Sequence, residues 1–143
     1  AAPSQVIAAM SKIQGQSTSN PSTIAQAAAA AALSGPQERL GTMVAEFRRR
    51  RDYVCERINA VDGMSVPVPE GAFYVFPNVR GLFDRAGVRD GDELALALLD
   101  NAGVGMVGGG GFGSTDHLRI SYATSMEQLE RGMDAVEGWL GSL

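Results

Sequence analysis

The chain has 143 residues, of which 45% are hydrophobic and 20% are charged, and its formal net charge is −4. This balance is typical of a folded globular protein and argues against intrinsic disorder, while the acidic charge argues against nucleic-acid binding. A single cysteine excludes an internal disulfide framework and a zinc cluster, and no apolar run is long enough to span a bilayer. The composition therefore predicts a soluble, cytoplasmic protein with no metal, nucleic-acid or membrane partner.

The first third of the chain is expected to be helical. Apolar side chains recur at three- and four-residue spacing over residues 4–13, and a polar stretch that ends at Pro21 is typical of a loop. A second helix is predicted over residues 23–33, capped by Asn20 or Ser22. This helix has almost no polar face, and a helix that is apolar all round is usually buried on most sides. Either its alanines serve only helix formation and close packing, or it packs against a surface outside this chain.

A long helix is predicted over residues 37–61, because apolar side chains such as Val54 and Ile58 trace a helical stripe along it. Four consecutive arginines at 48–51 lie in the middle of this helix. Acidic residues on both sides of the run can pair with them at helical spacing, so the run is expected to be a solvated face of the helix.

The second half of the chain alternates short strands and helices. Strands are predicted at 64–68, 72–79, 104–107 and 118–123, and helices at 93–102 and 125–140. The last helix has a capping box, with Ser125 as N-cap and Gln128 three residues later. This order of elements predicts a compact α/β or α+β unit.

A run of glycines at 108–111, followed by Phe112 and Gly113, separates the last two predicted strands. A phosphate-binding loop needs a lysine after its glycines and a helix that begins there, and neither follows this run. We expect a flexible connector instead. His117, the only histidine, has no positioned nucleophile or acidic partner in the sequence and is expected to be structural or exposed.

Arg119 is the strongest candidate for a binding residue. It lies inside an otherwise apolar predicted strand, and a guanidinium is rarely buried without a partner. Its planar fork of donors fits a carboxylate bidentately, and Gly71, at the start of a neighbouring strand, lets another group approach the backbone closely. Together they predict an arginine held on a strand to bind a carboxylate. No catalytic base is evident beside it, because Lys12 is the only lysine.

Three other side chains give weaker signals. Phe73 and Tyr74 are expected in the core, with the alternative that Phe73 lines a pocket. Cys55, within the long predicted helix, is expected to be a small packing residue or an exposed thiol.

Four segments of the chain carry a family resemblance in one order. They are KIQGQSTSNP at 12–21, RRRRD at 48–52, PEGAFY at 69–74 and LRISYATS at 118–125. Together they closely resemble the C-terminal part of class I pyridoxal-phosphate-dependent aminotransferases, particularly the bacterial aspartate aminotransferases. The resemblance covers essentially the whole chain.

The resemblance implies an α/β fold that is part of a pyridoxal-phosphate-dependent transferase. Residues 1–33 are then the C-terminal tail of the large cofactor-binding domain, and residues 34–61 the long helix that connects the domains. Residues 62–143 form a small C-terminal domain, with a mixed sheet and flanking helices.

The resemblance also implies site residues and substrates. Arg119 matches the arginine that binds the substrate α-carboxylate, and Phe73 matches an aromatic residue near the substrate entrance. Ser19 and Asn20 match a loop that lies near the neighbouring subunit's active site in the family homodimer. The implied reaction transfers an amino group between an amino acid, aspartate or a similar one, and a 2-oxo acid.

The family's Schiff-base lysine lies upstream of this chain's first residue, and Lys12 does not match it. We therefore expect pyridoxal phosphate in the full-length enzyme, and neither bound cofactor nor catalysis on this chain alone. Relatives usually have a proline where this chain has Gly108, which adds freedom to the glycine run. An alternative from another functional class is a non-catalytic module for carboxylate binding or dimerisation. The alanine-rich helix argues against this alternative because it needs a partner surface, and the isolated chain is therefore expected to expose apolar area and to self-associate.

Overall fold

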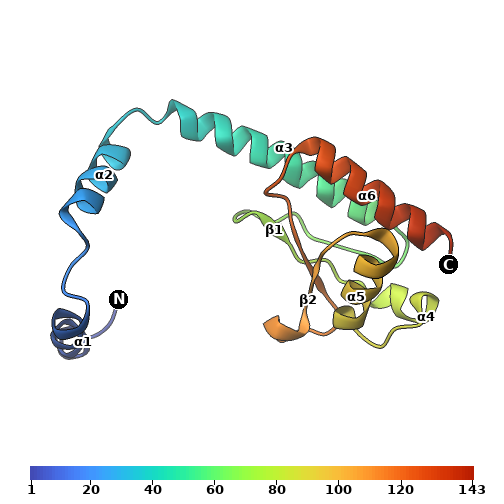
Figure 1. Ribbon diagram of the computed structural model, residues 1–143, viewed down its shortest axis with the longest axis horizontal. Helices are drawn as coiled ribbons and strands as arrows, with labels where there is room; N and C mark the ends of the chain where they lie inside the picture. The colour runs from blue at the N-terminus through green and yellow to red at the C-terminus, as the bar shows by residue number, and fades with distance from the viewer. The chain divides into compact units, whose positions relative to one another are not determined.

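The structure is a computed structural model that describes residues 1–143. The chain contacts divide it into two units, Ala1–Arg39 and Leu40–Leu143, and each unit is described by itself (Figure 1). No helix in the chain combines the length and the apolar character that crossing a membrane requires. The elements in chain order are α1 (Ser4–Ser17), α2 (Thr23–Ser34), α3 (Glu38–Ala60), β1 (Tyr74–Val75), the 3-10 turn η1 (Arg80–Leu82), α4 (Phe83–Ala86), α5 (Gly91–Ala102), β2 (Val107–Gly108), the 3-10 turn η2 (Gly110–Phe112), β3 (Leu118–Ser121) and α6 (Met126–Gly141).

The first unit consists of α1 and α2, and neither helix contains a buried residue. Helix α1 runs four residues beyond its predicted end, and the Ser17 hydroxyl donates a hydrogen bond to the carbonyl of Ile13 at 3.0 Å. Of the two predicted caps for α2, Ser22 is the one observed, because its hydroxyl accepts from the N–H of Ala25 at 3.2 Å. Within this unit, the apolar surface of α2 is therefore left uncovered.

The second unit contains a three-stranded sheet in the order β1-β3-β2. Tyr74 pairs with Ser121 and Val107 with Arg119, and both pairings are antiparallel. The predicted α/β fold class is confirmed, but the sheet is antiparallel throughout where a mixed sheet was expected. The reason is local: β2 and β3 are joined by residues 109–117 alone, which is shorter than the crossover of about a dozen or more residues that parallel neighbours need.

The strand predicted at 64–68 does not form. Only an isolated bridge between Ser65 and Asn78 remains there. Pro67 and Pro69 lack the N–H that a ladder requires, so the segment cannot continue as a strand.

The core of the second unit lies between the inner face of the sheet and the helices. It takes Val54 and Ile58 from α3, which are 1% and 0% exposed, as the helical stripe predicted. Cys55 is buried among them as a small packing residue. The sheet, α5 and α6 contribute Val75, Leu118, Ile120, Leu94, Leu98, Leu129, Met133, Val136 and Leu140.

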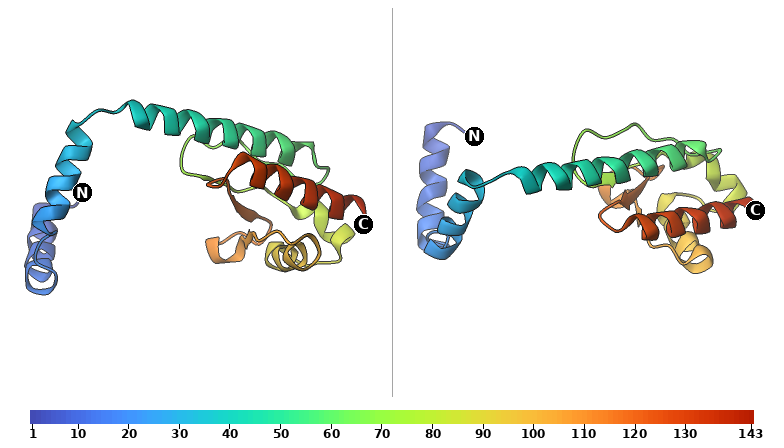
Figure 2. Two further views of the ribbon diagram at one scale, coloured as in Figure 1. Left: turned by 45° about the horizontal axis from the view of Figure 1, so that its top comes forward. Right: turned by 90° about the horizontal axis from the view of Figure 1, so that it is seen from above.

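Helices α3 and α6 lie side by side on this core (Figure 2). Arg57 of α3 joins them, since its guanidinium donates to Glu137 at 2.7 Å and to Asp134 at 2.8 Å, both on α6. This connection spans about eighty residues of sequence and fixes the long helix against the C-terminal one.

The basic run on α3 is only partly the solvated face that the sequence predicted, because the Arg50 and Arg51 side chains are each 21% exposed while that of Arg49 is 58% exposed. Arg49 and Arg50 both pair with Glu46, at 2.9 and 2.8 Å, and Arg51 pairs with Asp52 at 2.7 Å. Hydrogen bonds first from Arg49 and then from Arg50 lower the pKa of Glu46 to about 2. Arg49, Arg50 and Arg51 are thus matched by acids of their own helix.

Candidate carboxylate-binding site

Strand β3 carries Arg119 on the open face of the sheet. Successive side chains of a strand point to opposite faces, and Leu118 and Ile120 are buried in the core at 0% and 8% exposure. Arg119 therefore points the other way, and it is half-buried rather than enclosed in the core. The sequence placed this arginine on the right strand, but the guanidinium is not buried as expected.

Two aromatic rings flank the Arg119 guanidinium. Its central carbon lies 4.7 Å from the ring centroid of Tyr74 and 4.6 Å from that of Phe112. No ion pair joins Arg119 to a carboxylate of this chain. Aromatic faces attract the cation without matching its fork of N–H donors. The arrangement can therefore bind a carboxylate that arrives from outside the chain.

The register of the sheet explains the position of Tyr74, which was wrongly expected in the core. Tyr74 is paired with Ser121, two residues beyond Arg119, and paired residues share a face. Tyr74 and Arg119 therefore lie on the same open face, and Val75 is the residue that enters the core. The contacts of Tyr74 and Phe112 with Arg119 were not predicted from the sequence. For Tyr74 a signal existed: neighbouring side chains of a strand point to opposite faces, so a core position for the apolar Val75 puts Tyr74 on the open face.

His117 belongs to the aromatic packing beside this site. Its ring stacks on Phe76 with centroids 4.8 Å apart, and its Nδ1 shares a hydrogen bond of 2.7 Å with the hydroxyl of Ser114. Phe76 in turn meets Phe112 edge-on at 6.1 Å. These contacts agree with the structural role that was expected for the histidine.

Phe73 also lies outside the core, with 42% of its surface exposed. Its ring packs 4.4 Å from that of Tyr74 and 6.5 Å from that of Phe47. It lines a hollow of about 410 Å³ together with Met43 and Phe47 of α3. The pocket alternative for Phe73 thus agrees with the structure, and its position near a substrate entrance stays a prediction.

Ser19 and Asn20 belong to the first unit, in the connection between α1 and α2. They line a hollow of about 400 Å³ with Ser11 and Gln14 of α1, and Ser19 adopts a left-handed backbone with φ 59°. Serine takes this conformation less readily than glycine or asparagine. The structure brings Tyr74 and Phe112 against Arg119 and Phe76 against Phe112, whereas the role of Ser19 and Asn20 beside a neighbouring subunit stays a prediction.

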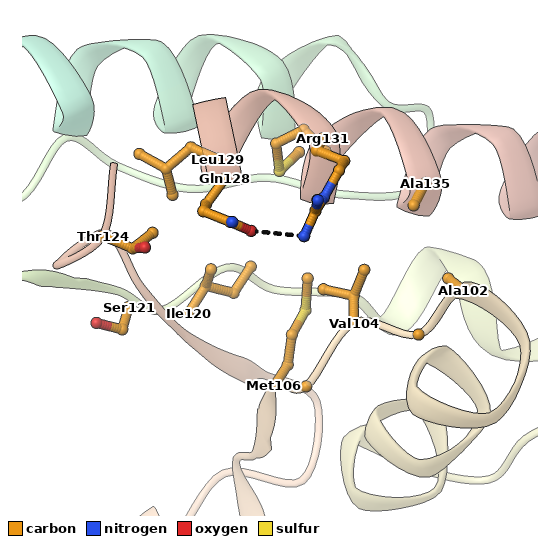
Figure 3. A pocket seen from close by; sticks show the side chains of 14 residues that line it. Ala102, Val104, Met106, Ile120, Ser121, Thr124, Gln128, Leu129, Arg131 and Ala135 are labelled. Carbon is orange, nitrogen blue, oxygen red and sulfur yellow. Dashed lines mark hydrogen bonds between the residues drawn. The ribbon is translucent and has the colours of Figure 1, made fainter. Parts of the chain in front are cut away.

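A separate hollow of about 520 Å³ lies between α6, β3 and the segment after α5 (Figure 3). Val104, Met106 and Ile120 give it an apolar lining. Among its polar side chains, Arg131 donates a hydrogen bond to the side-chain oxygen of Gln128 at 2.8 Å. No pair of side chains around it has the arrangement of a nucleophile and its base.

Residues 1–136 match the family described as "Aminotransferase class I and II". The chain belongs to this family. Over 148 residues this aminotransferase chain is 45% identical to an aspartate/prephenate aminotransferase of Cereibacter sphaeroides, and over 140 residues it is 42% identical to an aspartate aminotransferase of Geobacillus stearothermophilus. The matches cover 100% and 98% of the chain but only 37% and 36% of those two relatives.

Solved structures of aminotransferases share the fold of this chain. A crystal structure of the aspartate aminotransferase from Rhizobium meliloti matches with a TM-score of 0.87 and 38% identity, over 96% of this chain and 36% of that one. The aromatic aminotransferase from Pyrococcus horikoshii matches with a TM-score of 0.86 and 36% identity, over 99% of this chain and 38% of that one. The predicted resemblance to a part of these enzymes is confirmed.

The residues of this aminotransferase chain do not by themselves fit pyridoxal phosphate. The unit that carries Arg119 contains no lysine, since Lys12 on α1 is the only lysine of the chain. No group of three or more histidine, cysteine or carboxylate side chains could hold a metal ion. What these residues offer is a half-buried cation on the open face of the sheet, flanked by two aromatic rings.

Proposed function

We propose that this chain is the C-terminal part of a pyridoxal-phosphate-dependent aminotransferase that exchanges an amino group between an amino acid, aspartate or a similar one, and a 2-oxo acid. In this proposal Arg119 binds the α-carboxylate of the substrate. The observation that carries it is a half-buried arginine between two rings with no carboxylate partner in the chain. The names of the two curated relatives, both aspartate-using aminotransferases, support the substrate class.

The contribution of Arg119 is orientation. A guanidinium that donates two parallel hydrogen bonds to a carboxylate fixes both the position and the rotation of the substrate. Holding a reactant in the productive geometry can supply several kcal/mol of a reaction barrier. Arg119 itself transfers no proton, because a guanidinium stays protonated in proteins.

The proposal extends to the organisation of the full-length enzyme. Residues 1–33 are the tail of a large domain that binds the cofactor, 34–61 are the connecting helix, and 62–143 are the small domain. The enzyme is a cytoplasmic homodimer in which Ser19 and Asn20 lie near the partner's active site. The chain on its own binds no cofactor and does not catalyse the reaction.

The test is substitution of Arg119 in the full-length enzyme. Arg119→Ala is expected to raise KM for both the amino acid and the 2-oxo acid by about two to three orders of magnitude, because a charged pair is lost. Binding of pyridoxal phosphate, followed by its absorbance, is expected to survive. Arg85→Ala, which removes an exposed arginine from α4, is the matched control. Unchanged KM values for the Arg119 variant would overturn the proposal.

A further inference from the structure

We propose that Phe112 is a positioning residue for the Arg119 guanidinium, and that a contact between Asp92 and the glycine run holds Phe112 in place. This inference rests on the proposed role of Arg119. It concerns three elements that meet at one side of the sheet: β3, the turn η2 and the first turn of α5.

The first step is the geometry of the cation. The rings of Tyr74 and Phe112 come from different elements, yet both centroids lie within 4.7 Å of the Arg119 central carbon. A long arginine side chain on an open face has many rotamers, and ordering it costs conformational entropy. Two rings that attract the cation restrict it before a ligand binds. The rings leave the in-plane N–H donors of Arg119 without a partner, whereas a carboxylate of the chain would occupy those donors.

The second step is that Phe112 is itself fixed, although 51% of its surface is exposed. Its backbone N–H donates to the carbonyl of Gly109 at 2.9 Å, which closes the turn η2. Its ring meets Phe76 edge-on at 6.1 Å, and Phe76 is held by stacking on His117. The ring therefore approaches Arg119 from a defined direction.

The third step is the contact that orders the glycine run. Oδ1 of Asp92 accepts a hydrogen bond from the N–H of Gly110 at 3.2 Å. A Cβ atom added to Gly108 or to Gly110 would overlap the Asp92 carboxylate. At Gly108 such a Cβ would also come within 2.6 Å of the Asp92 Cα, whereas at Gly110 it would meet only the end of the Asp92 side chain, so the run passes closest to Asp92 at Gly108.

This arrangement changes the interpretation of the glycine run. The sequence predicts a flexible connector, but in the structure the run is closed by backbone hydrogen bonds and docked on α5. The N–H of Gly109 donates to the carbonyl of His117 at 2.8 Å, and that of Ser114 to the carbonyl of Gly109 at 3.1 Å. Gly108 and Gly110 lie close against Asp92. This docking places Phe112 over Arg119.

The first experiment compares Phe112→Leu with Phe112→Tyr in the full-length holoenzyme. Removing the ring is expected to raise KM for the amino acid and the 2-oxo acid by about 3- to 30-fold, the range of a cation–π contact. The turnover number is expected to change less, and Phe112→Tyr, which keeps a ring, is expected to retain the original KM. Leu96→Ala, at a 63% exposed position on α5, is the control.

A double-mutant cycle separates positioning from general structure. In an Arg119→Ala background, Phe112→Leu is expected to have no further effect on KM, because its effect acts through the guanidinium. A merely structural role would give the same fold-change in both backgrounds, and that result would overturn the inference.

Asp92→Ala provides a second, independent variant that leaves the ring intact. Asp92→Ala removes the acceptor for the Gly110 N–H and is expected to raise KM, as Phe112→Leu does. When the two substitutions are combined, the effect on KM is expected to be smaller than the sum of the two separate effects. Asp100→Ala, at the other end of the same helix and exposed, is its control. If neither Asp92→Ala nor Phe112→Leu moves KM while Arg119→Ala does, this inference fails and the proposed function stands. If Arg119→Ala moves nothing, the proposed function fails as well.

Discussion

Tyr122 connects the core of the second unit to the turn that carries Phe73. Only 2% of its surface is exposed, and its hydroxyl donates to the carbonyl of Ala72 at 2.9 Å. Ala72 adopts a left-handed backbone with φ 62°, a conformation that costs free energy for a residue with a Cβ. The Tyr122 hydrogen bond compensates part of that cost by holding the turn.

Tyr122→Phe keeps the ring but removes this hydrogen bond. The free energy of unfolding is expected to fall by about 1 kcal/mol, the usual net value of a buried hydrogen bond, as measured by urea denaturation. Tyr74→Phe is the matched control and is expected to stay within about 0.5 kcal/mol, since it removes a hydroxyl at a half-buried position outside the core. Equal losses in the two variants would show that the Ala72 contact contributes nothing.

Alkaline pH is expected to destabilise the protein through two groups of the core. Burial raises the pKa of the Cys55 thiol and of the Tyr122 hydroxyl above their ordinary values of 9.0 and 10.0. The folded state therefore holds these protons more tightly than the unfolded state does. Their stabilising contribution is complete below pH 9.0 and is lost as the pH rises through the folded pKa values.

The measurement is the urea midpoint at several pH values between 7 and about 11. A double variant with Cys55→Ala and Tyr122→Phe, which cannot ionise at these positions, is expected to lose less stability across that range than the unaltered protein. The same pH dependence in both proteins would contradict the assignment to these two groups.

At the level of single residues, the candidate carboxylate-binding site was only partly predictable from the sequence. Arg119 is visible in the sequence because a lone charge in an apolar strand is rare. Tyr74 was misplaced because its face depends on the register with Ser121, which pairs residues far apart in the chain. Phe112 gives no local signal at all: it follows four glycines, and its contact with Arg119 depends on how the run docks on Asp92.

Among the elements, the pairing of α3 with α6 depends on Arg57. Its guanidinium bonds to Glu137 and Asp134 on α6 and to the hydroxyl of Tyr53, and its central carbon lies 5.5 Å from the Tyr53 ring centroid. Hydrogen bonds with Glu137 and then Asp134 raise the pKa of Arg57. The side chain is 24% exposed, so this network is better shielded from solvent than an ordinary surface pair.

Arg57→Met is expected to lower the free energy of unfolding by about 1–3 kcal/mol, because it breaks several charged hydrogen bonds at once. Arg89→Met is the control: its side chain is 86% exposed and pairs only with Glu93, so the expected loss is below about 0.5 kcal/mol. Thermal and urea unfolding measure both variants. A loss for Arg57→Met no larger than that of the control would contradict a role in joining the helices.

Element types were easier to predict than their ends. The Ser125 cap is observed, with its hydroxyl accepting from the N–H of Gln128 at 3.3 Å, yet the Gln128 side chain pairs with Arg131 and not with the cap. Helix α5 begins two residues before its predicted start, because Asp90 caps it by accepting from the N–H of Glu93 at 2.9 Å. Strands were overestimated, since ladders as short as Tyr74–Val75 depend on tertiary pairing and not on local propensity.

For the whole molecule, the distribution of burial separates the two units. Every buried hydrophobic residue of the chain lies at Val54 or beyond, and none lies in α1 or α2. The apolar helix α2 was expected either to use its alanines for helix formation and close packing or to pack against a surface outside this chain, and within its own unit it buries no residue. The chain spans only 37% and 36% of the first two curated relatives, which is consistent with a covering surface elsewhere in such enzymes.

The last prediction follows from this distribution. In the isolated chain, Ile24 and Leu33 of α2 are 82% and 84% exposed, and Ile13 of α1 is 71% exposed. Exposed apolar area of this extent favours association, so the 143-residue chain is expected to self-associate in light scattering and to bind a hydrophobic dye.

Residues 40–143 alone are the matched control, because they keep all of the buried core. This shorter chain is expected to be monomeric, to bind little dye and to melt at nearly the same temperature as the longer one. The helices α1 and α2 contribute no core contacts, so removing them changes solubility and not the stability of the second unit. A longer chain that stays monomeric, with no more dye bound than the shorter one, would show that α1 and α2 bury their apolar side chains against each other or against the second unit in solution.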